Sequence, residues 1–260
     1  MTNTLATPPV EALLSRMFAE AAAQDRAGQP EMPPGTTYAN ASMEEMSEAY
    51  QDRYIPVSPQ AGQLLYALAR VSRPETIVEF GLSFGVSTIY LAAAVTDNGT
   101  GRVVTTELNL KKIEVAKANL KEAGVNEVVT ILPGDALETL ADVPGPVGLV
   151  LLDGWKSLCL PVLRLLEPKL APGALIAADD SSFPVEDGVE LSSWTGRLAL
   201  GGGRRASLPE LSFGRRAAGC HELPPLGRPR WGTPRTGVWW RVMAWLLVPY
   251  SVRLGWFVVA

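Results

Sequence analysis

Residues 76–95 read TIVEFGLSFGVSTIYLAAAV, which is a short apolar run, a turn with two glycines and a helix-like segment. The alternation repeats along the chain, with apolar runs at 76–80, 102–106, 128–132, 147–152 and 173–178 and helix-like segments at 85–95, 109–124, 136–142 and 156–170. This spacing is typical of parallel strands connected by helices. Near-continuous apolar strands indicate a sheet covered on both faces. The sequence therefore predicts a doubly wound, mostly parallel α/β fold.

Four further segments flank this pattern. Apolar spacing predicts helices at 9–27 and 59–71, and a Pro- and Gly-containing composition predicts a loop at 28–42. Residues 186–194, with a turn at Asp187-Gly188, predict one more strand. The chain is accordingly divided into an N-terminal helix and loop (1–44), an α/β domain (45–196) and an atypical tail (197–260).

The composition excludes several classes of protein. With 260 residues, 47% of them hydrophobic, the chain can bury a core and is not globally disordered. Two Cys cannot form a disulfide framework or a Cys-rich zinc site, and one His excludes most His-based metal sites. A net charge of −4 gives no reason to expect nucleic-acid binding. No basic region followed by an apolar run opens the sequence, which predicts a cytoplasmic protein.

Charge is unevenly distributed, because residues 197–260 contain ten Arg and only two acidic residues. Within this tail, residues 238–260 are long enough to span a bilayer, but Arg241, Pro249 and Arg253 interrupt them. A mid-span Arg costs about 2.5–3.5 kcal/mol on insertion scales. A membrane span is therefore not expected, and a weak interfacial role for the segment stays open.

The ends of the predicted strands carry the candidate binding residues, because ligands of open parallel sheets bind at the carboxyl edge. Glu79 is followed by Gly81 and Gly85, which permit a tight turn and close approach of a ligand, although a plain strand-to-helix turn has the same glycines. Glu107 ends the second strand, where a carboxylate can accept hydrogen bonds from both ribose hydroxyls. Its alternative role is a charge at a helix N-terminus next to the N-cap Asn109.

The glycine spacing departs from the dinucleotide pattern, because G-x-x-x-G replaces G-x-G-x-x-G. A carboxylate at Glu79 would serve a pyrophosphate poorly and a cationic amino-acid end well, which favours S-adenosyl-L-methionine and disfavours a nicotinamide-dependent oxidoreductase. The third strand leads into Gly134-Asp135-Ala136. Asp135 there either hydrogen-bonds the adenine amino group or caps the next helix.

Carboxylates also follow the fourth and fifth strands, as Asp153 in L-L-D-G-W-K and as Asp179 and Asp180 in A-A-D-D. If these strands are neighbours, the three groups converge and repel one another. A hard divalent cation with oxygen ligands, such as Mg²⁺, resolves that repulsion. The alternative is that Asp153 caps a helix and one of the other two faces solvent. Lys156 is a candidate general base for a hydroxyl substrate, and otherwise a solvated surface lysine.

At these motifs the chain resembles the cation-dependent O-methyltransferases of the catechol O-methyltransferase type, particularly their small bacterial relatives. The matching stretches are V-E-F-G-L-S-F-G-V-S-T, T-T-E-L-N, P-G-D-A-L-E-T-L, L-L-D-G-W-K and L-A-P-G-A-L-I-A-A-D-D, within residues 45–196. The resemblance implies a Rossmann-like fold and a phenolic, catechol-like substrate. Relatives often form dimers, which makes a homodimer an expectation.

The resemblance also implies roles for individual residues. Asp153, Asp179 and Asp180 are expected to hold the cation, and Lys156 to act as the base. It further implies that Gly81, Ser87 and Glu107 contact the cofactor and that the Gly134–Ala136 turn lies by the adenine. With the other candidates at the strand ends, the residues expected to bind the cofactor are Glu79, Gly81, Ser83, Gly85, Ser87, Glu107, Gly134, Asp135, Ala136 and Asp153.

The chain departs from these relatives in three places. Asp180 stands where they commonly have Asn, and Gly154 where many have a bulkier residue. Ser181 to Pro184 runs almost directly into the last predicted strand, where relatives usually insert a helix and a strand. The C-terminal sheet elements are thus expected to be incomplete, and the 197–260 tail suggests a read-through or shifted frame. This leaves a second hypothesis, a protein that binds the cofactor with impaired or no turnover, and a further one in which the tail binds a membrane surface or a partner.

Overall fold

The computed structural model describes residues 3–37, 40–180 and 188–193, all within the unit Met1–Ala206. The helices are η1 (Thr4–Ala6), α1 (Pro8–Ala27), α2 (Met43–Ala49), α3 (Pro59–Ser72), α4 (Val86–Asn98), α5 (Leu110–Glu122), η2 (Asn126–Val128), α6 (Ala136–Thr139), α7 (Lys156–Leu166) and η3 (Glu167–Lys169). The strands are β1 (Thr76–Phe80), β2 (Arg102–Glu107), β3 (Val129–Pro133), β4 (Val147–Leu152), β5 (Leu170–Asp180) and β6 (Gly188–Ser193).

The strands form one sheet in the order β3-β2-β1-β4-β5-β6. The first five are parallel, and β6 pairs antiparallel with β5. Phe80 at the end of β1 pairs with Thr106 of β2 on one side and with Leu152 of β4 on the other, so the strands end at a common edge. The predicted doubly wound, mostly parallel α/β fold is confirmed.

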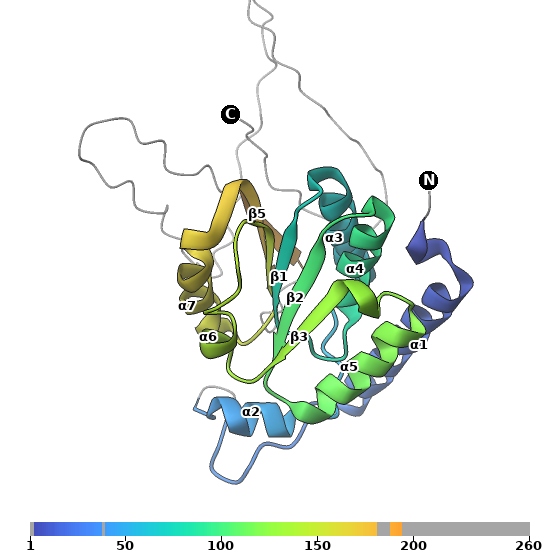
Figure 1. Cartoon of the computed structure of the whole chain (residues 1–260). Helices are drawn as coiled ribbons and strands as arrows, with labels where there is room; N and C mark the ends of the chain where they lie inside the picture. Colours follow the sequence, from blue (N-terminus) through green and yellow to red (C-terminus); the bar gives the residue numbers. More distant parts are fainter. Residues whose placement is uncertain (1–2, 38–39, 181–187, 194–260) are drawn as a thin grey trace, which may run out of the picture. The chain divides into compact units, whose positions relative to one another are not determined.

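Helices cover both faces of the sheet, with α1, α3, α4 and α5 on one side and α6 and α7 on the other (Figure 1). Side chains alternate between the two cores along each strand. In β1, Ile77 packs with α1, α3 and α4, whereas Val78 and Phe80 pack with α6 and α7. All five residues of β1 are buried, which is why the sequence of this strand is nearly continuous in apolar residues.

The predicted elements are found with small shifts of their ends. Helix α7 ends at Leu166 rather than 170, and the 3₁₀ turn η3 follows it, because Pro168 has no N–H with which to continue the helical hydrogen bonds. Strand β5 begins three residues earlier than predicted, at Leu170. The strand predicted at 186–194 is β6, whereas the predicted tail at 197–260 lies outside the described residues.

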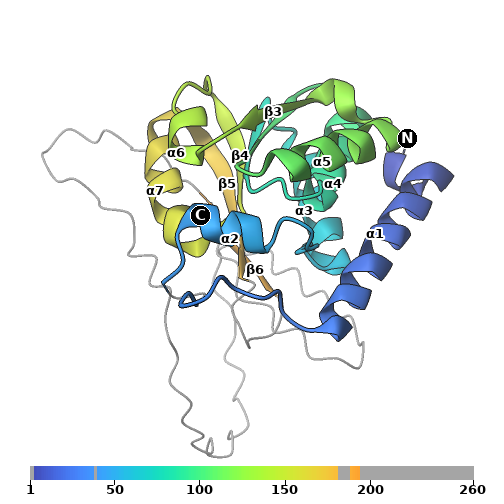
Figure 2. The same cartoon turned by 90° about the horizontal axis from the view of Figure 1, so that it is seen from below.

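One α-helix, α2, and the short 3₁₀ helices η1 and η2 were not predicted. Helix α2 begins with a capping box, in which the Ser42 hydroxyl accepts a hydrogen bond from the Glu45 N–H at 3.2 Å and the Glu45 carboxylate accepts one from the Ser42 N–H at 2.8 Å. Asn109, the N-cap of α5, donates its side-chain amide to the Ser47 carbonyl at 3.1 Å. This contact holds α2 near the strand ends, and Figure 2 views the molecule from that side.

Within the part of the chain that the structure describes, no helix combines the length and apolar character needed to cross a bilayer. The interfacial segment considered at 238–260 lies outside that part.

Candidate functional site

The turn after β1 brings the ends of two strands into close contact. Gly81 has φ +103°, and a Cβ placed there would lie 2.5 Å from the carbonyl oxygen of Asp153. The Asp153 N–H donates a hydrogen bond to the Phe80 carbonyl at 2.8 Å. Only glycine fits this position, because both the backbone conformation and the neighbouring backbone exclude a side chain. Gly85 takes φ +90° where α4 begins.

Glu107 is held at the end of β2 by two backbone donors. Its Oε2 accepts a hydrogen bond from the Ser83 N–H at 2.8 Å, and its Oε1 accepts one from the Asn109 N–H at 2.9 Å. Asn109 caps α5 with its own side chain, as the sequence predicted. The carboxylate of Glu107 thus joins the glycine turn to α5 and lines a cleft at the carboxyl edge of the sheet.

This cleft has a volume of about 280 Å³. Its lining combines the ends of β1, β2 and β4, the turn before α6 and the first turns of α2, α5 and α7. Among the predicted cofactor residues, the cleft is lined by Gly81, Ser83, Glu107, Gly134, Asp135, Ala136 and Asp153. Lys156 also lines it.

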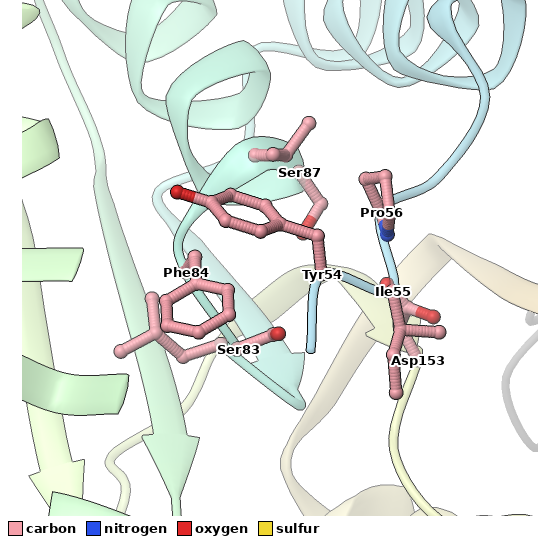
Figure 3. A pocket seen from close by; sticks show the side chains of 9 residues that line it. Tyr54, Ile55, Pro56, Ser83, Phe84, Ser87 and Asp153 are labelled. Carbon is pink, nitrogen blue, oxygen red and sulfur yellow. The ribbon is translucent and has the colours of Figure 1, made fainter. Parts of the chain in front are cut away.

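A small pocket opens beside the glycine turn and shares Ile55, Ser83 and Asp153 with the cleft. Its volume of about 10 Å³ is enough for roughly one water molecule. Figure 3 shows Ser83 and Phe84 on one side of it and Asp153 on the other. Ser87, another predicted cofactor residue, is buried and lines this pocket.

Glu79 lies behind the turn and lines neither the cleft nor the small pocket. Its side chain is fully buried, and the Thr88 hydroxyl of α4 donates a hydrogen bond to its Oε2 at 2.5 Å. Its Oε1 has no hydrogen-bond partner among the described residues. Burial raises the pKa of Glu79, an effect that neighbouring hydroxyls partly offset.

In the turn before α6, Asp135 both caps the helix and lines the cleft. Gly134 takes φ +121°, and Asp135 accepts a hydrogen bond from the Leu137 N–H at 2.7 Å, so Asp135 caps α6. Asp135 also lines the cleft with Ala136. Capping uses one carboxylate oxygen, and therefore does not exclude the predicted contact with an adenine.

The ends of β4 and β5 place two carboxylates together. The strands are neighbours, with Leu152 paired to Ala178, and the side chains of Asp153 and Asp179 share a hydrogen bond. Removal from water raises the pKa of Asp153 well above its usual range, and the charges of Asp179 and Glu79 add to the shift. Asp153 does not cap α7, whose N-cap is Trp155.

The three-carboxylate site stays a prediction, because the side chain of Asp180 lies outside the described residues. Within the described residues, no group of three or more acidic, His or Cys side chains is arranged to hold a metal ion. Lys156 is the first residue of α7, exposed at the rim of the cleft.

Comparison with known proteins identifies the family. A family profile described as a methyltransferase domain matches residues 78–181. A catechol O-methyltransferase from Niastella koreensis is 32% identical over 155 residues, which cover 58% of this chain and 68% of the relative. One from Mycobacterium tuberculosis is 36% identical over 135 residues, covering 52% of this chain and 60% of the relative. The chain belongs to the S-adenosylmethionine-dependent O-methyltransferases.

Solved structures of O-methyltransferases also match the chain. An enzyme from Bacillus cereus in complex with S-adenosylhomocysteine is 25% identical, with a TM-score of 0.47, and the match covers 63% of this chain and 74% of that one. TomG from Streptomyces achromogenes, in complex with S-adenosylmethionine, is 26% identical, with a TM-score of 0.47 and coverage of 65% and 80%.

Three residues that line this methyltransferase's cleft were given no role in the sequence interpretation. Tyr50 follows α2 and meets Trp155 edge to face, with ring centroids 5.7 Å apart and planes at 73°. Both line the cleft, as does Lys112 of α5, which is only 5% exposed. Ser42-x-x-Glu45 was a signal for α2, but nothing in the sequence around Lys112 distinguishes it from the surface lysines of the same helix.

Proposed function

We propose that the protein transfers a methyl group from S-adenosylmethionine to a hydroxyl of a phenolic, catechol-like small molecule, with a divalent cation assisting. The observation that carries the proposal is the paired carboxylates Asp153 and Asp179 at the edge of a cleft that Lys156 and two aromatic rings also line. The relatives from Niastella koreensis and Mycobacterium tuberculosis are named catechol O-methyltransferases, which favours this substrate class.

The donor set fits a hard cation. Asp153 and Asp179 offer carboxylate oxygens from adjacent strand ends, and Asp180 follows directly in the chain. Two carboxylates in contact raise each other's pKa unless a positive charge compensates them. Oxygen-only ligand sets suit Mg²⁺. When bound, such an ion would act as a Lewis acid that stabilises a negatively charged substrate oxygen.

Lys156 is placed to handle the proton of the substrate hydroxyl. Lys156 is the first residue of α7, three residues after Asp153, and it lines the cleft. In its neutral form, Nζ would accept the hydroxyl proton, and the oxygen would attack the methyl carbon of the cofactor, so that an O–CH₃ bond forms, the S–CH₃ bond breaks and S-adenosylhomocysteine leaves. General base catalysis of this kind contributes about 10²–10⁴-fold to a rate.

The acceptor side of the cleft suits a flat aromatic ring. Tyr50 and Trp155 meet edge to face there, and Met43 and Leu158 extend the apolar lining. Aromatic rings stack favourably in such an environment, and the pair Tyr50–Trp155 also links α2 to the start of α7. A phenol bound against these rings would have its hydroxyl within the region of Asp153 and Lys156.

Methyl transfer from labelled S-adenosylmethionine to a panel of catechols and monophenols tests the proposal, with Mg²⁺ present or replaced by a chelator. We expect transfer to catechols that chelation abolishes and added Mg²⁺ restores. Transfer that persists in chelator would refute the metal assignment. Cofactor binding without transfer to any phenol would support the second hypothesis, a binding protein without turnover.

A further inference from the structure

Lys112 is a buried lysine in the cofactor cleft. It lies in the first turn of α5, its residue is 5% exposed, and it lines the cleft next to Ser83 and Glu107. Lysines are almost never this buried unless their charge is paired. Its neighbour Lys111 has the usual environment, with a side chain 55% exposed and an ion pair to Asp52.

The ammonium of Lys112 has few partners in the described part of the chain. Its Nζ donates one hydrogen bond, to the Ser83 hydroxyl at 3.3 Å, and lies 5.3 Å from the centre of the Phe84 ring. No carboxylate there lies within ion-pair distance of it. Burial lowers the pKa of Lys112, while the more distant charges of Glu107, Asp153 and Asp52 partly offset that effect. An ammonium has three N–H groups, so two can still bind an acceptor in the cleft.

Glu107 has complementary capacity. Each of its oxygens accepts one backbone N–H, from Ser83 or Asn109, and each retains a further lone pair. A vicinal diol offers hydroxyl protons to a carboxylate and oxygen lone pairs to an ammonium at the same time. Glu107 and Lys112, which both bond to Ser83, therefore offer an acceptor for the ribose hydroxyl protons and a donor to the ribose hydroxyl oxygens.

We infer that Lys112 is a second ribose-binding residue, which donates a hydrogen bond to a cofactor hydroxyl oxygen while Glu107 accepts from the diol. The inference rests on S-adenosylmethionine binding in this cleft and on the ribose role of Glu107. It does not depend on the acceptor substrate or on a cation. Within the fold, the ammonium of Lys112 has the hydrogen bond to Ser83 and the cation–π contact with the Phe84 ring, and these leave two of its N–H groups for a ligand.

Calorimetric titration of Lys112→Met tests the inference, because methionine keeps the unbranched stem and removes the ammonium. The ligands are S-adenosylhomocysteine, its 2′-deoxy and 3′-deoxy ribose analogues, and 5′-methylthioadenosine, which keeps the ribose and lacks the amino-acid end. Hydrogen bonds to charged groups correspond to about a 10- to 100-fold change in Kd. We expect Lys112→Met to raise the Kd of S-adenosylhomocysteine and that of methylthioadenosine by this same factor. The variant should also lose most of the wild-type discrimination against one deoxy analogue.

Lys111→Met is the matched control, because it removes a charge from the adjacent exposed position and should leave every Kd unchanged. An equal loss for the parent ligand and both deoxy analogues, with methylthioadenosine unaffected, would place Lys112 at the amino-acid carboxylate and overturn the inference. Unchanged affinity for all ligands would reduce Lys112 to a packing role and overturn it as well. Failure of the wild type to bind S-adenosylhomocysteine would instead remove the cofactor assignment on which the inference rests.

Discussion

The two halves of the carboxyl edge are built differently. At the ends of β1 and β2, the glycine turn and Glu107 are fixed by backbone geometry and backbone donors, which leave little freedom of position. At the ends of β4 and β5, burial and the charge of Asp179 raise the pKa of Asp153, and Lys156 is exposed. The first half is thus preorganised for a cofactor, whereas the second contains the groups proposed to bind a cation and to take a proton. Substitutions in the first half should therefore alter cofactor binding, and substitutions in the second half should alter turnover.

The largest effect is expected at Lys156. Lys156→Met should lower kcat by about 10²–10⁴-fold, because it removes the group proposed to take the substrate proton. The Kd of S-adenosylhomocysteine and the melting temperature should not change, since the residue is exposed and lies in the second half of the edge. Steady-state kinetics and calorimetry measure the two quantities. Lys117→Met, at an exposed pair with Glu114, is the control and should leave kcat intact.

Gly81→Ala should lower both the stability of the protein and the affinity of the β1–β2 half of the edge for the cofactor. The added Cβ would meet the Asp153 carbonyl at 2.5 Å in a backbone conformation that alanine rarely adopts. Strain and overpacking together suggest a loss of about 2–5 kcal/mol in the free energy of unfolding. Urea unfolding should show that loss, and titration should show weaker S-adenosylhomocysteine binding.

Gly148→Ala separates these two effects. A Cβ at Gly148 would lie 2.8 Å from the Cβ of Pro74, and this residue of β4 does not line the cleft. Gly148→Ala should therefore lower stability and leave the Kd of S-adenosylhomocysteine unchanged. If both variants weaken the cofactor site equally, the first half would have no special preorganisation.

Binding of Mg²⁺ to the second half should be measurable as an increase in stability. A ligand that binds only the folded state at 100 times its Kd stabilises it by about 2.7 kcal/mol, or roughly 5–10 °C in melting temperature for a chain of this size. We expect MgCl₂ to raise the melting temperature of the wild type in this way. Asp153→Asn should remove the response and, without Mg²⁺, melt above the wild type, because it relieves repulsion with Asp179. An equal Mg²⁺ response in both proteins would contradict the site.

The sequence was sufficient for the sheet because its strands are buried on both faces. Val78 and Val150, on neighbouring strands, are both fully buried, and such strands appear as apolar runs whatever their partners. The strand-end rule then placed Gly81, Glu107 and Asp153 at one cleft. These successes depend on local pattern and on a general property of parallel sheets.

Residues whose environment comes from tertiary contacts were not predictable in the same way. Lys112 follows another lysine in an amphipathic helix, and its burial results from packing against Ser83 and Phe84, 28 and more residues earlier. Glu79, whose contact with the cofactor stays a prediction, is hydrogen-bonded to Thr88 of α4 and does not line the cleft. Local periodicity says nothing about which loop will cover a given side chain.

The smallest expected effect lies at the boundary between the two halves. A Cβ at Gly154 would lie 2.3 Å from the buried ring of Phe80, which ends β1 and fills the space beside β4. Gly154→Ala should therefore cost about 1–3 kcal/mol of stability by overpacking, and Phe80→Leu about 1 kcal/mol by leaving a gap. The double variant should lose less than the sum by about 1 kcal/mol, because leucine makes room for the new methyl group. Urea unfolding of the four proteins measures this coupling. Additive losses would mean that the ring and Gly154 relax independently, and the two halves would then meet only through the backbone at Gly81.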